Sequence, residues 1–422
     1  MSVKTILYFS YTQYFLIVWY KVKEHCMRTV GTVVRGIRCP IFRQGNNLAS
    51  QIVEALQAAS ISEGFQLRDN DVVGITESVV ARTQGNFVSV DEITAEIKEK
   101  FPSGELGIVF PILSRNRFSL LLKAIAAGVR KVHLLLSYPA DEVGNHLMDP
   151  EMLDDSGLNP HCDILDEAQY RQYFGYRTVH PFTGIDYVEL YKDLVGPEKA
   201  VFHFGNDPRA ILQFCRHVLT ADVHSRKRSK KLLRQAGAAS VFGLDDICTA
   251  PVRSGGGYNE QYGLLGSNLA GNDKVKLFPR DCQALVEDIQ QRLRQLTGKE
   301  IQVMIYGDGA FKDPVGKIWE LADPVVSPGY TSGLNGTPSE LKLKFLADEG
   351  ERQGLDQEAV RMAILQKIRE KAPNLVGQQA SLGTTPRQLT DLLGSLCDLT
   401  SGSGDKGTPV VLIQGYFDNF AD

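Results

Sequence analysis

Short apolar runs alternate along the chain with longer segments in which apolar residues recur at helical spacing. The apolar runs predict strands at residues 31–37, 71–76, 107–112, 131–138, 200–205, 302–307 and 409–416. The helical pattern predicts helices over residues 48–59, 118–128, 209–219, 282–297, 358–371 and 386–397. Alternating strands and helices are typical of an α/β class, here with a mixed sheet (α+β).

The clearest helix signal is "CQALVEDIQQRLRQL", at residues 282–296. Asp281 precedes it and is predicted to cap its first turn. A basic segment at 224–235 predicts a second kind of helix, with Val223, Leu232 and Leu233 on its buried side. A solvated face explains these charges, and binding of an anionic partner is the alternative.

The first residues form an apolar, aromatic stretch, "ILYFSYTQYFLIVWY" at 6–20. It is shorter than a comfortable membrane span and lacks the small-residue cleavage site of a signal peptide. We interpret residues 1–28 as a spurious or dispensable extension, with a membrane anchor as the alternative. No membrane partner is therefore expected.

Composition narrows the function classes. The 422 residues exceed one small core and predict more than one domain. A net charge of −4 argues against a nucleic-acid partner. Seven scattered cysteines with no CxxC pair predict reduced thiols in a cytoplasmic protein, without a zinc site.

The segment "GITESVVARTQGNFV" at 74–88 ends a strand in polar residues. Ser78 and Arg82 lie where a strand gives way to a short helix, a position that presents side chains and amides to a ligand. The alternative is a simple helix cap made by Thr76 or Ser78.

Glycines and polar residues gather in "YNEQYGLLGSNLAGNDKVKLFPRDC", at 258–282. Gly263 and Gly266 allow close backbone approach near Ser267 and Asn268, although an ordinary turn explains the same pattern.

The segment "VMIYGDGAFKDPVG" places Asp308 between two glycines at the end of a predicted strand, with Lys312 nearby. Carboxylates suit Mg²⁺ or Mn²⁺, and a lysine suits phosphate oxygens. A surface turn is the alternative.

The loop "TSGSGDKGTP" at 400–409 contains Gly404 and Asp405. It runs from a helix into a strand and is therefore not a Walker A loop. Its amides are suited to an anion, and its carboxylate to a metal, unless it is only a connector. No GxSxG elbow is present, and the adjacent His161, Cys162 and Asp163 fit an ordinary loop.

These segments, together with "VVRGIRCPIFRQGNNLASQIVEAL" at 33–56, resemble in order the coenzyme F420-0:L-glutamate ligases. Arg82 stands where that family has a nucleotide-contacting lysine, and Gly85 keeps its glycine. The resemblance covers residues 29–100 and about 258–422. Residues 101–257 are interpreted as an inserted α/β region.

The resemblance implies a GTP-dependent amide ligase (ATP possible) that uses Mg²⁺ or Mn²⁺. It would activate a small-molecule carboxylate acceptor as an acyl phosphate and join L-glutamate to it. The family's intertwined pairs imply a homodimer. The implied nucleotide contacts are Pro40, Ile41, Ser78, Arg82, Asn268 and Gly404. The implied metal ligands are Asp308 and Asp405, and the implied catalytic residues are Asp308 and Lys312.

The chain departs from the family pattern at its metal positions. Leu265 stands where the family has a metal-binding aspartate, Gly309 follows Asp308, and Leu392 replaces an acidic residue. A leucine cannot supply a metal ligand. The alternatives are an acceptor other than F420-0, such as a folate, or a non-catalytic nucleotide-binding protein on the ligase fold.

In the inserted region, Arg115 and Arg117 are candidates to clamp a carboxylate or phosphate, with structural salt bridges as the alternative.

Overall fold

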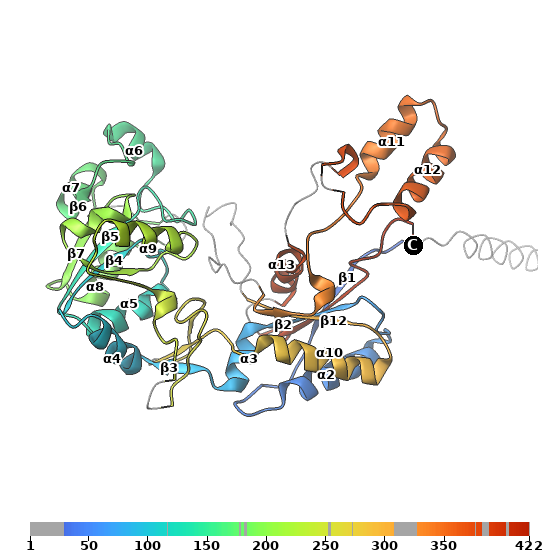
Figure 1. Cartoon of the computed structure of the whole chain (residues 1–422), viewed down its shortest axis with the longest axis horizontal. Coiled ribbons are helices and arrows are strands. Elements are labelled where there is room, and N and C mark those ends of the chain that lie inside the picture. The colour runs from blue at the N-terminus through green and yellow to red at the C-terminus, as the bar shows by residue number, and fades with distance from the viewer. Residues whose placement is uncertain are drawn as a thin grey trace, which may run out of the picture.

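The computed structural model describes residues 29–115, 117–176, 179–180, 184–251, 255–271, 273–307, 327–375, 377–381, 388–401 and 405–421. The N-terminal stretch, Asp308, Lys312 and Gly404 lie outside these residues. Two β-sheets, each covered by its own helices, form two lobes (Figure 1). Within the described residues, no helix combines the length and the hydropathy that crossing a membrane requires.

The first lobe is built on a mixed five-stranded sheet, in which β2 and β12 are parallel and the other neighbours antiparallel. Across the sheet the strands are β1 (Val33–Ile37), β14 (Val410–Gln414), β2 (Val72–Thr76), β12 (Gln302–Tyr306) and β13 (Gly329–Tyr330). Helices α2 (Leu48–Glu63) and α10 (Cys282–Thr297) share one apolar core with the sheet, and α13 (Leu389–Ser401) packs on the opposite face (Figure 1).

Local signals explain where these helices begin and end. The Asn47 side chain accepts a hydrogen bond from the Ser50 amide at the start of α2, and Gly64 ends that helix in the left-handed conformation. Helix α10 begins after Asp281 as predicted, but the Asp281 side chain makes no capping bond. A projecting helical hairpin, α11 (Leu343–Arg352) and α12 (Gln357–Arg369), has a small core of its own.

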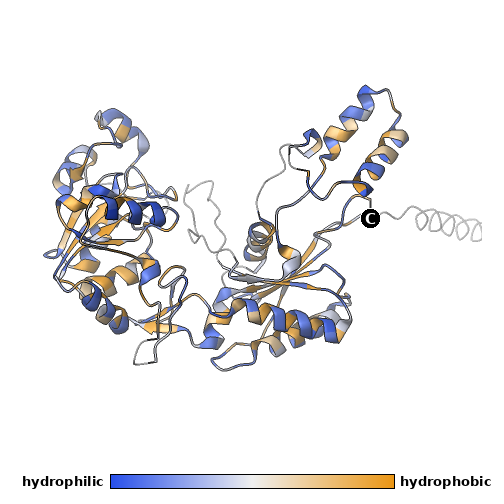
Figure 2. Cartoon of the chain, viewed as in Figure 1, coloured by the Kyte–Doolittle hydropathy of each residue, from blue (hydrophilic) through white to orange (hydrophobic). Residues whose placement is uncertain are grey.

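The second lobe contains a six-stranded sheet covered on both faces. Across the sheet the strands are β6 (Leu165–Asp166), β7 (Ala200–Phe204), β5 (Lys131–Leu136), β4 (Glu105–Val109), β8 (His217–Thr220) and β9 (Ser240–Gly243). All neighbours are parallel except β6 with β7. The strands are orange in Figure 2, as expected for a sheet buried on both faces, and α9 (Arg226–Gln235) is mostly blue.

The remaining helices of this lobe are α4 (Val90–Lys100), α5 (Phe118–Ala127), α6 (Pro150–Ser156), α7 (Glu167–Phe174) and α8 (Tyr187–Val195). Helices α4, α5 and α8 share the larger apolar core on one face. A 3₁₀ segment, η1 (Pro208–Gln213), and Leu233 of α9 pack on the other face. The basic helix therefore has a buried side, as the sequence predicts.

One predicted helix is wrong. Residues 209–213 belong to η1 and residues 217–219 to β8, with residues 214–216 connecting the two. Residues 218–220 pair with β4, and 217–220 pair with β9, in a parallel register. These long-range backbone hydrogen bonds override the local helical pattern.

A small antiparallel sheet joins the two lobes. Its strands are β10 (Asn268–Leu269), β11 (Lys274–Lys276) and β3 (Phe87–Ser89). Strand β3 lies between α3 (Glu77–Gln84) of the first lobe and α4 of the second. The Ser89 and Glu92 side chains form a capping box that starts α4.

Candidate active site

A pocket with a cavity volume of about 530 Å³ lies where the five-stranded sheet meets the small antiparallel sheet. Segments far apart in the sequence line it: residues 39–42, 76–79 and 82, 268 and 276, 398 and 401, and 407–409. This volume is in the range of small-molecule and cofactor sites.

Backbone hydrogen bonds hold three of these segments together. The Cys39 amide donates to the carbonyl of Gly407 at 3.0 Å, and the Thr76 amide donates to the carbonyl of Pro409 at 3.0 Å. The loop before β14 is thereby fixed beside the end of β2, where α3 begins. One wall of the pocket is therefore set by main-chain pairing.

A buried ion pair forms the polar centre of the pocket. Lys276 Nζ lies 3.1 Å from Glu77 Oε1 and donates to Ser78 Oγ at 2.7 Å. Thr76 Oγ1 donates to the other Glu77 oxygen at 2.9 Å. Glu77 is 3% exposed and Lys276 is 8% exposed, so both charges depend on these partners.

These bonds also bear on the alternative interpretation of residues 74–88, in which Thr76 or Ser78 only caps a helix. Thr76 is the residue before α3, and its side chain makes no capping bond to the helix. The Ser78 hydroxyl accepts its bond from Lys276. Both hydroxyls are thus engaged by charged side chains of the pocket.

A second carboxylate, Asp398 of α13, lies close to this ion pair. Burial raises the pKa of Asp398 first, and the negative charge of Glu77 raises it further. Arg117 of the second lobe acts in the opposite direction and lowers the pKa of Asp398. The pocket therefore brings two carboxylates close enough for the charge of Glu77 to raise the pKa of Asp398.

Tyr306 ends β12 next to this group and is 1% exposed. Burial raises its pKa well above the ordinary value for a phenol. Ser401 lies near enough to lower that pKa, yet the Tyr306 hydroxyl makes no hydrogen bond of ordinary geometry within the described part of the chain. It is a buried hydroxyl close to Glu77 and Asp398, although Tyr306 does not line the pocket itself.

Five residues that the sequence singled out for nucleotide contact line this one pocket: Pro40, Ile41, Ser78, Arg82 and Asn268. Asp405 is exposed in a turn, and the neighbouring pocket wall is formed by Gly407 and Thr408. The predicted Asp308, Lys312 and Gly404 lie outside the described residues.

Three charged residues of the pocket were not predicted as site residues from the sequence: Glu77, Lys276 and Asp398. Glu77 was quoted there only as part of a polar strand end. Lys276 alternates with an exposed Lys274, and no local signal separates the two. Asp398 occupies an ordinary helix position whose direction only the packing of α13 reveals.

The residues present could hold a divalent cation only if the substrate's phosphates and water supplied the remaining ligands. Among the described residues, no group of three or more histidine, cysteine, aspartate or glutamate side chains is arranged to hold a metal. Glu77 and Asp398 both line the pocket. Mg²⁺ is commonly held by one or two carboxylates, with substrate phosphates and water as the other ligands, and this donor set matches that pattern.

The leucines that replace family acids have different surroundings. Leu265 is 2% exposed, belongs to the apolar core of the second lobe and lines a different pocket. Leu392 is half-buried on α13. The Leu265 position therefore contributes to an apolar surface, and the carboxylates of the site come from other elements.

The chain thus combines a mixed α/β fold with a pocket that is lined by both cationic and carboxylate side chains. The family model for F420-0:Gamma-glutamyl ligase matches residues 36–415, and the chain belongs to that family. The matched range includes residues 101–257. No curated protein matches the chain.

Proposed function

We propose that the protein is a nucleotide-dependent amide ligase that joins L-glutamate to a small carboxylate acceptor. GTP is the proposed phosphoryl donor, with ATP as the alternative. The acceptor is F420-0 or another small carboxylic acid such as a folate. The observation that carries the proposal is the single pocket that places Lys276 and Arg82 beside Glu77 and Asp398.

The pocket supports a nucleotide in three ways. Ile41 is 79% exposed at its rim and offers apolar surface, next to Pro40, for a base. Ser78, Arg82 and Asn268 supply polar groups for the sugar and phosphates. Gly404, which lies outside the described residues, is a further proposed phosphate contact.

Lys276 and the proposed catalytic Lys312 would stabilise charge on the transferred phosphoryl group. Lys276 is held in place by Glu77 and Ser78, so little reorganisation is needed when phosphate oxygens arrive. Asp308 and Asp405 are proposed as metal ligands together with Glu77 and Asp398. A bound Mg²⁺ or Mn²⁺ would neutralise phosphate charge.

The reaction balances as two displacements. An acceptor carboxylate oxygen attacks the γ-phosphorus, the bond to the β-phosphate oxygen breaks, and the nucleoside diphosphate leaves. The α-amine of L-glutamate then attacks the acyl carbon, phosphate leaves, and the amine proton passes to it. The residues of this chain position the reactants and exclude water from the acyl phosphate. We also propose a cytoplasmic homodimer, on the basis of the family.

The test is turnover by the purified protein with GTP or ATP, Mg²⁺ or Mn²⁺, L-glutamate and F420-0. Phosphate release and product mass are followed together. Arg82→Met and Lys276→Met are expected to lower kcat/KM at least tenfold. Lys274→Met, on the exposed part of the same strand, is the matched control and should keep the wild-type rate.

A glutamylated product that depends on Lys276 supports the proposal. Nucleotide turnover without that product keeps the ligase class and directs the search to another acceptor. Nucleotide binding without metal-dependent turnover, by protein with a native circular dichroism spectrum, overturns the proposal. It would favour a binding protein on the ligase fold, a reading that the buried Leu265 already motivates.

A further inference from the structure

The second lobe has a ligand-binding arrangement of its own. Its parallel strands, taken in chain order β4, β5, β7, β8 and β9, lie across the sheet in the order 3-2-1-4-5. In such sheets the chain turns in opposite directions from the first strand, and ligands bind at the carboxyl ends of the strands beside that point. Here that point lies between β4 and β8.

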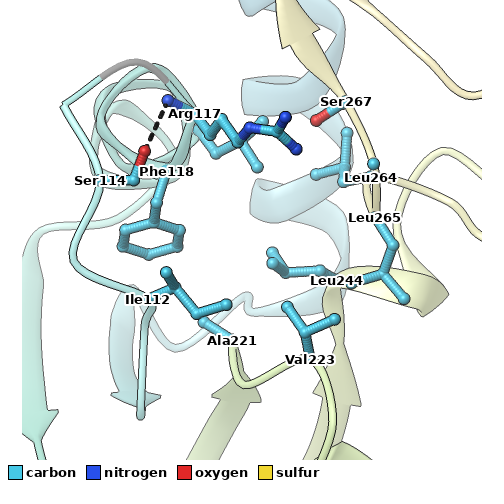
Figure 3. A pocket seen from close by; sticks show the side chains of 12 residues that line it. Ile112, Ser114, Arg117, Phe118, Ala221, Val223, Leu244, Leu264, Leu265 and Ser267 are labelled. Atoms are coloured by element: carbon cyan, nitrogen blue, oxygen red, sulfur yellow. Dashed lines mark hydrogen bonds between the residues drawn. The ribbon is translucent and has the colours of Figure 1, made fainter. Parts of the chain in front are cut away.

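A pocket occupies this position (Figure 3). Ile112, Ser114 and Arg117 follow β4, and Ala221 and Val223 follow β8. Leu264, Leu265 and Ser267 close it from the segment that leads to the small antiparallel sheet. The cavity of about 60 Å³ is space for roughly four to six water-sized positions, which suits a compact hydrocarbon group rather than a whole nucleotide.

Two polar groups in this pocket point to a ligand with an anionic end. The Ser267 hydroxyl is buried, and within the described part of the chain it has no hydrogen-bond partner. Figure 3 shows the Arg117 guanidinium on the same side of the pocket as this hydroxyl. Arg117 also stands at the beginning of α5, whose first turn carries no acidic residue, so the helix dipole adds positive potential there.

The structure argues against a dinucleotide at the same point. The loop between β4 and α5, "FPILSRNR" at 110–117, contains no glycine that would let a pyrophosphate approach the backbone. The beginning of α9 is already occupied, because the Glu142 carboxylate accepts from the Val223, His224 and Ser225 amides. Arg117 supplies positive potential at this pocket, and Ser267 supplies a hydroxyl without a partner among the described residues. An anionic group is therefore expected to bind beside these two residues.

We propose that this pocket binds a small carboxylic acid with a compact apolar group. The apolar group packs on Val223, Leu264 and Leu265, and the carboxylate meets Arg117 and Ser267. We further assign it as the subsite for the carboxylate acceptor, a step that rests on the function proposed above. Ser267 lines this pocket and the adjacent Asn268 lines the nucleotide pocket, so the two sites adjoin. Arg117 also influences Asp398 of the nucleotide pocket.

Calorimetric titration with isovalerate and benzoate tests the site, with isovaleramide and benzamide as neutral matches. We expect the acids to bind at least tenfold more tightly than the amides. Arg117→Met should weaken acid binding at least tenfold, and Lys123→Met, at an exposed position of α5 that does not line the pocket, should leave it unchanged. Ala221→Leu, which fills the cavity, should abolish binding, and Ser267→Ala should weaken it without a large effect on folding. GTP binding should be preserved in all of these variants.

The outcomes separate this proposal from the ligase proposal. The acid site is overturned, and the ligase proposal stands, if GTP binds but neither acid does. The same holds if Arg117→Met and Ala221→Leu leave acid binding unchanged. If the acids bind with the expected pattern but no acid and nucleotide combination turns over, the site is supported and its acceptor role is overturned. An Arg117→Met enzyme with a raised KM for the acceptor and an unchanged KM for GTP supports both.

Discussion

Lys276 is a buried cation whose partner lies 199 positions away in the chain. Replacement by Met would leave Glu77 buried with only the Thr76 hydroxyl, and breaking such a pair costs about 3–5 kcal/mol. We therefore expect Lys276→Met to lower the free energy of unfolding by roughly that amount, measured in urea. Lys274→Met should lower it by less than about 0.5 kcal/mol. Equal losses for the two variants would show that the pair does not stabilise the fold.

For single residues, the sequence predicted some members of the pocket and gave no indication of others. Pro40, Ser78 and Asn268 stand in recognisable family segments, and the structure places them together. Lys276 and Asp398 look like ordinary surface charges in the sequence. They enter the pocket only because β11 pairs with β3 and α13 packs across β2, contacts that no local pattern encodes.

Among the elements, α13 lies so close to β2 that one strand position has no room for a side chain. A Cβ at Gly74 would meet Cys397 Sγ at 2.3 Å. We expect Gly74→Ala to push α13 from the sheet and to cost about 1–3 kcal/mol of stability. Because α13 carries Asp398 and Ser401, nucleotide affinity measured by calorimetry should fall as well. Gly31→Ala, where a Cβ would meet nothing within 4 Å, is the control. Full nucleotide affinity in a destabilised Gly74→Ala protein would contradict this link.

The pairing of β5 with β7 predicts a pH dependence. His133 and His203 face each other with ring nitrogens 3.1 Å apart, and Phe214 stacks on His203. Burial, followed by the neighbouring His133, lowers the pKa of His203 to about 4, and burial lowers the pKa of His133. Between pH 6.5 and 4 the unfolded chain therefore binds protons that the native protein does not. Stability is full above pH 6.5 and falls with decreasing pH, by up to about 1.4 kcal/mol per pH unit for each histidine.

Urea midpoints measured at pH 7 and pH 5 check this expectation. His203→Gln should reduce the loss of stability between the two values, and His161→Gln, in an exposed loop, should not. A His203→Gln protein with the wild-type pH slope would contradict the assignment to this pair. Neither residue attracted notice in the sequence, because strand pairing alone brings them together.

The error at residues 209–219 has the same origin. Pro208 is suited to a helix start, and the following residues have apolar spacing that favours continuation. The chain nevertheless leaves η1 after Gln213 and enters β8, since residues 218–220 gain hydrogen bonds to strands on both sides. Helix α10, which needs no such partner to define its ends, matches its predicted bounds.

For the whole molecule, the α/β class followed from the alternation of patterns, whereas the strand order did not. The order 3-2-1-4-5 and the distribution of apolar residues over separate cores are properties of the assembled chain. The five-stranded sheet has cores on its two faces, distinct from those of the six-stranded sheet. A ligand that binds the first lobe therefore acts directly on only part of the stabilising contacts.

This division predicts how nucleotide binding changes unfolding. GTP at 100 times its Kd should stabilise the lobe that binds it by about 2.7 kcal/mol. Calorimetric melting should then show two transitions, of which GTP raises one. Hydrogen exchange should assign that transition to β2, α3 and α13, which carry the pocket, with β7 and β9 exchanging as before. The small acid proposed for the second pocket should raise the other transition, because residues of the second lobe line most of that pocket. A single transition that either ligand shifts would show that the two lobes unfold together. The separate apolar cores would then not make the lobes unfold independently.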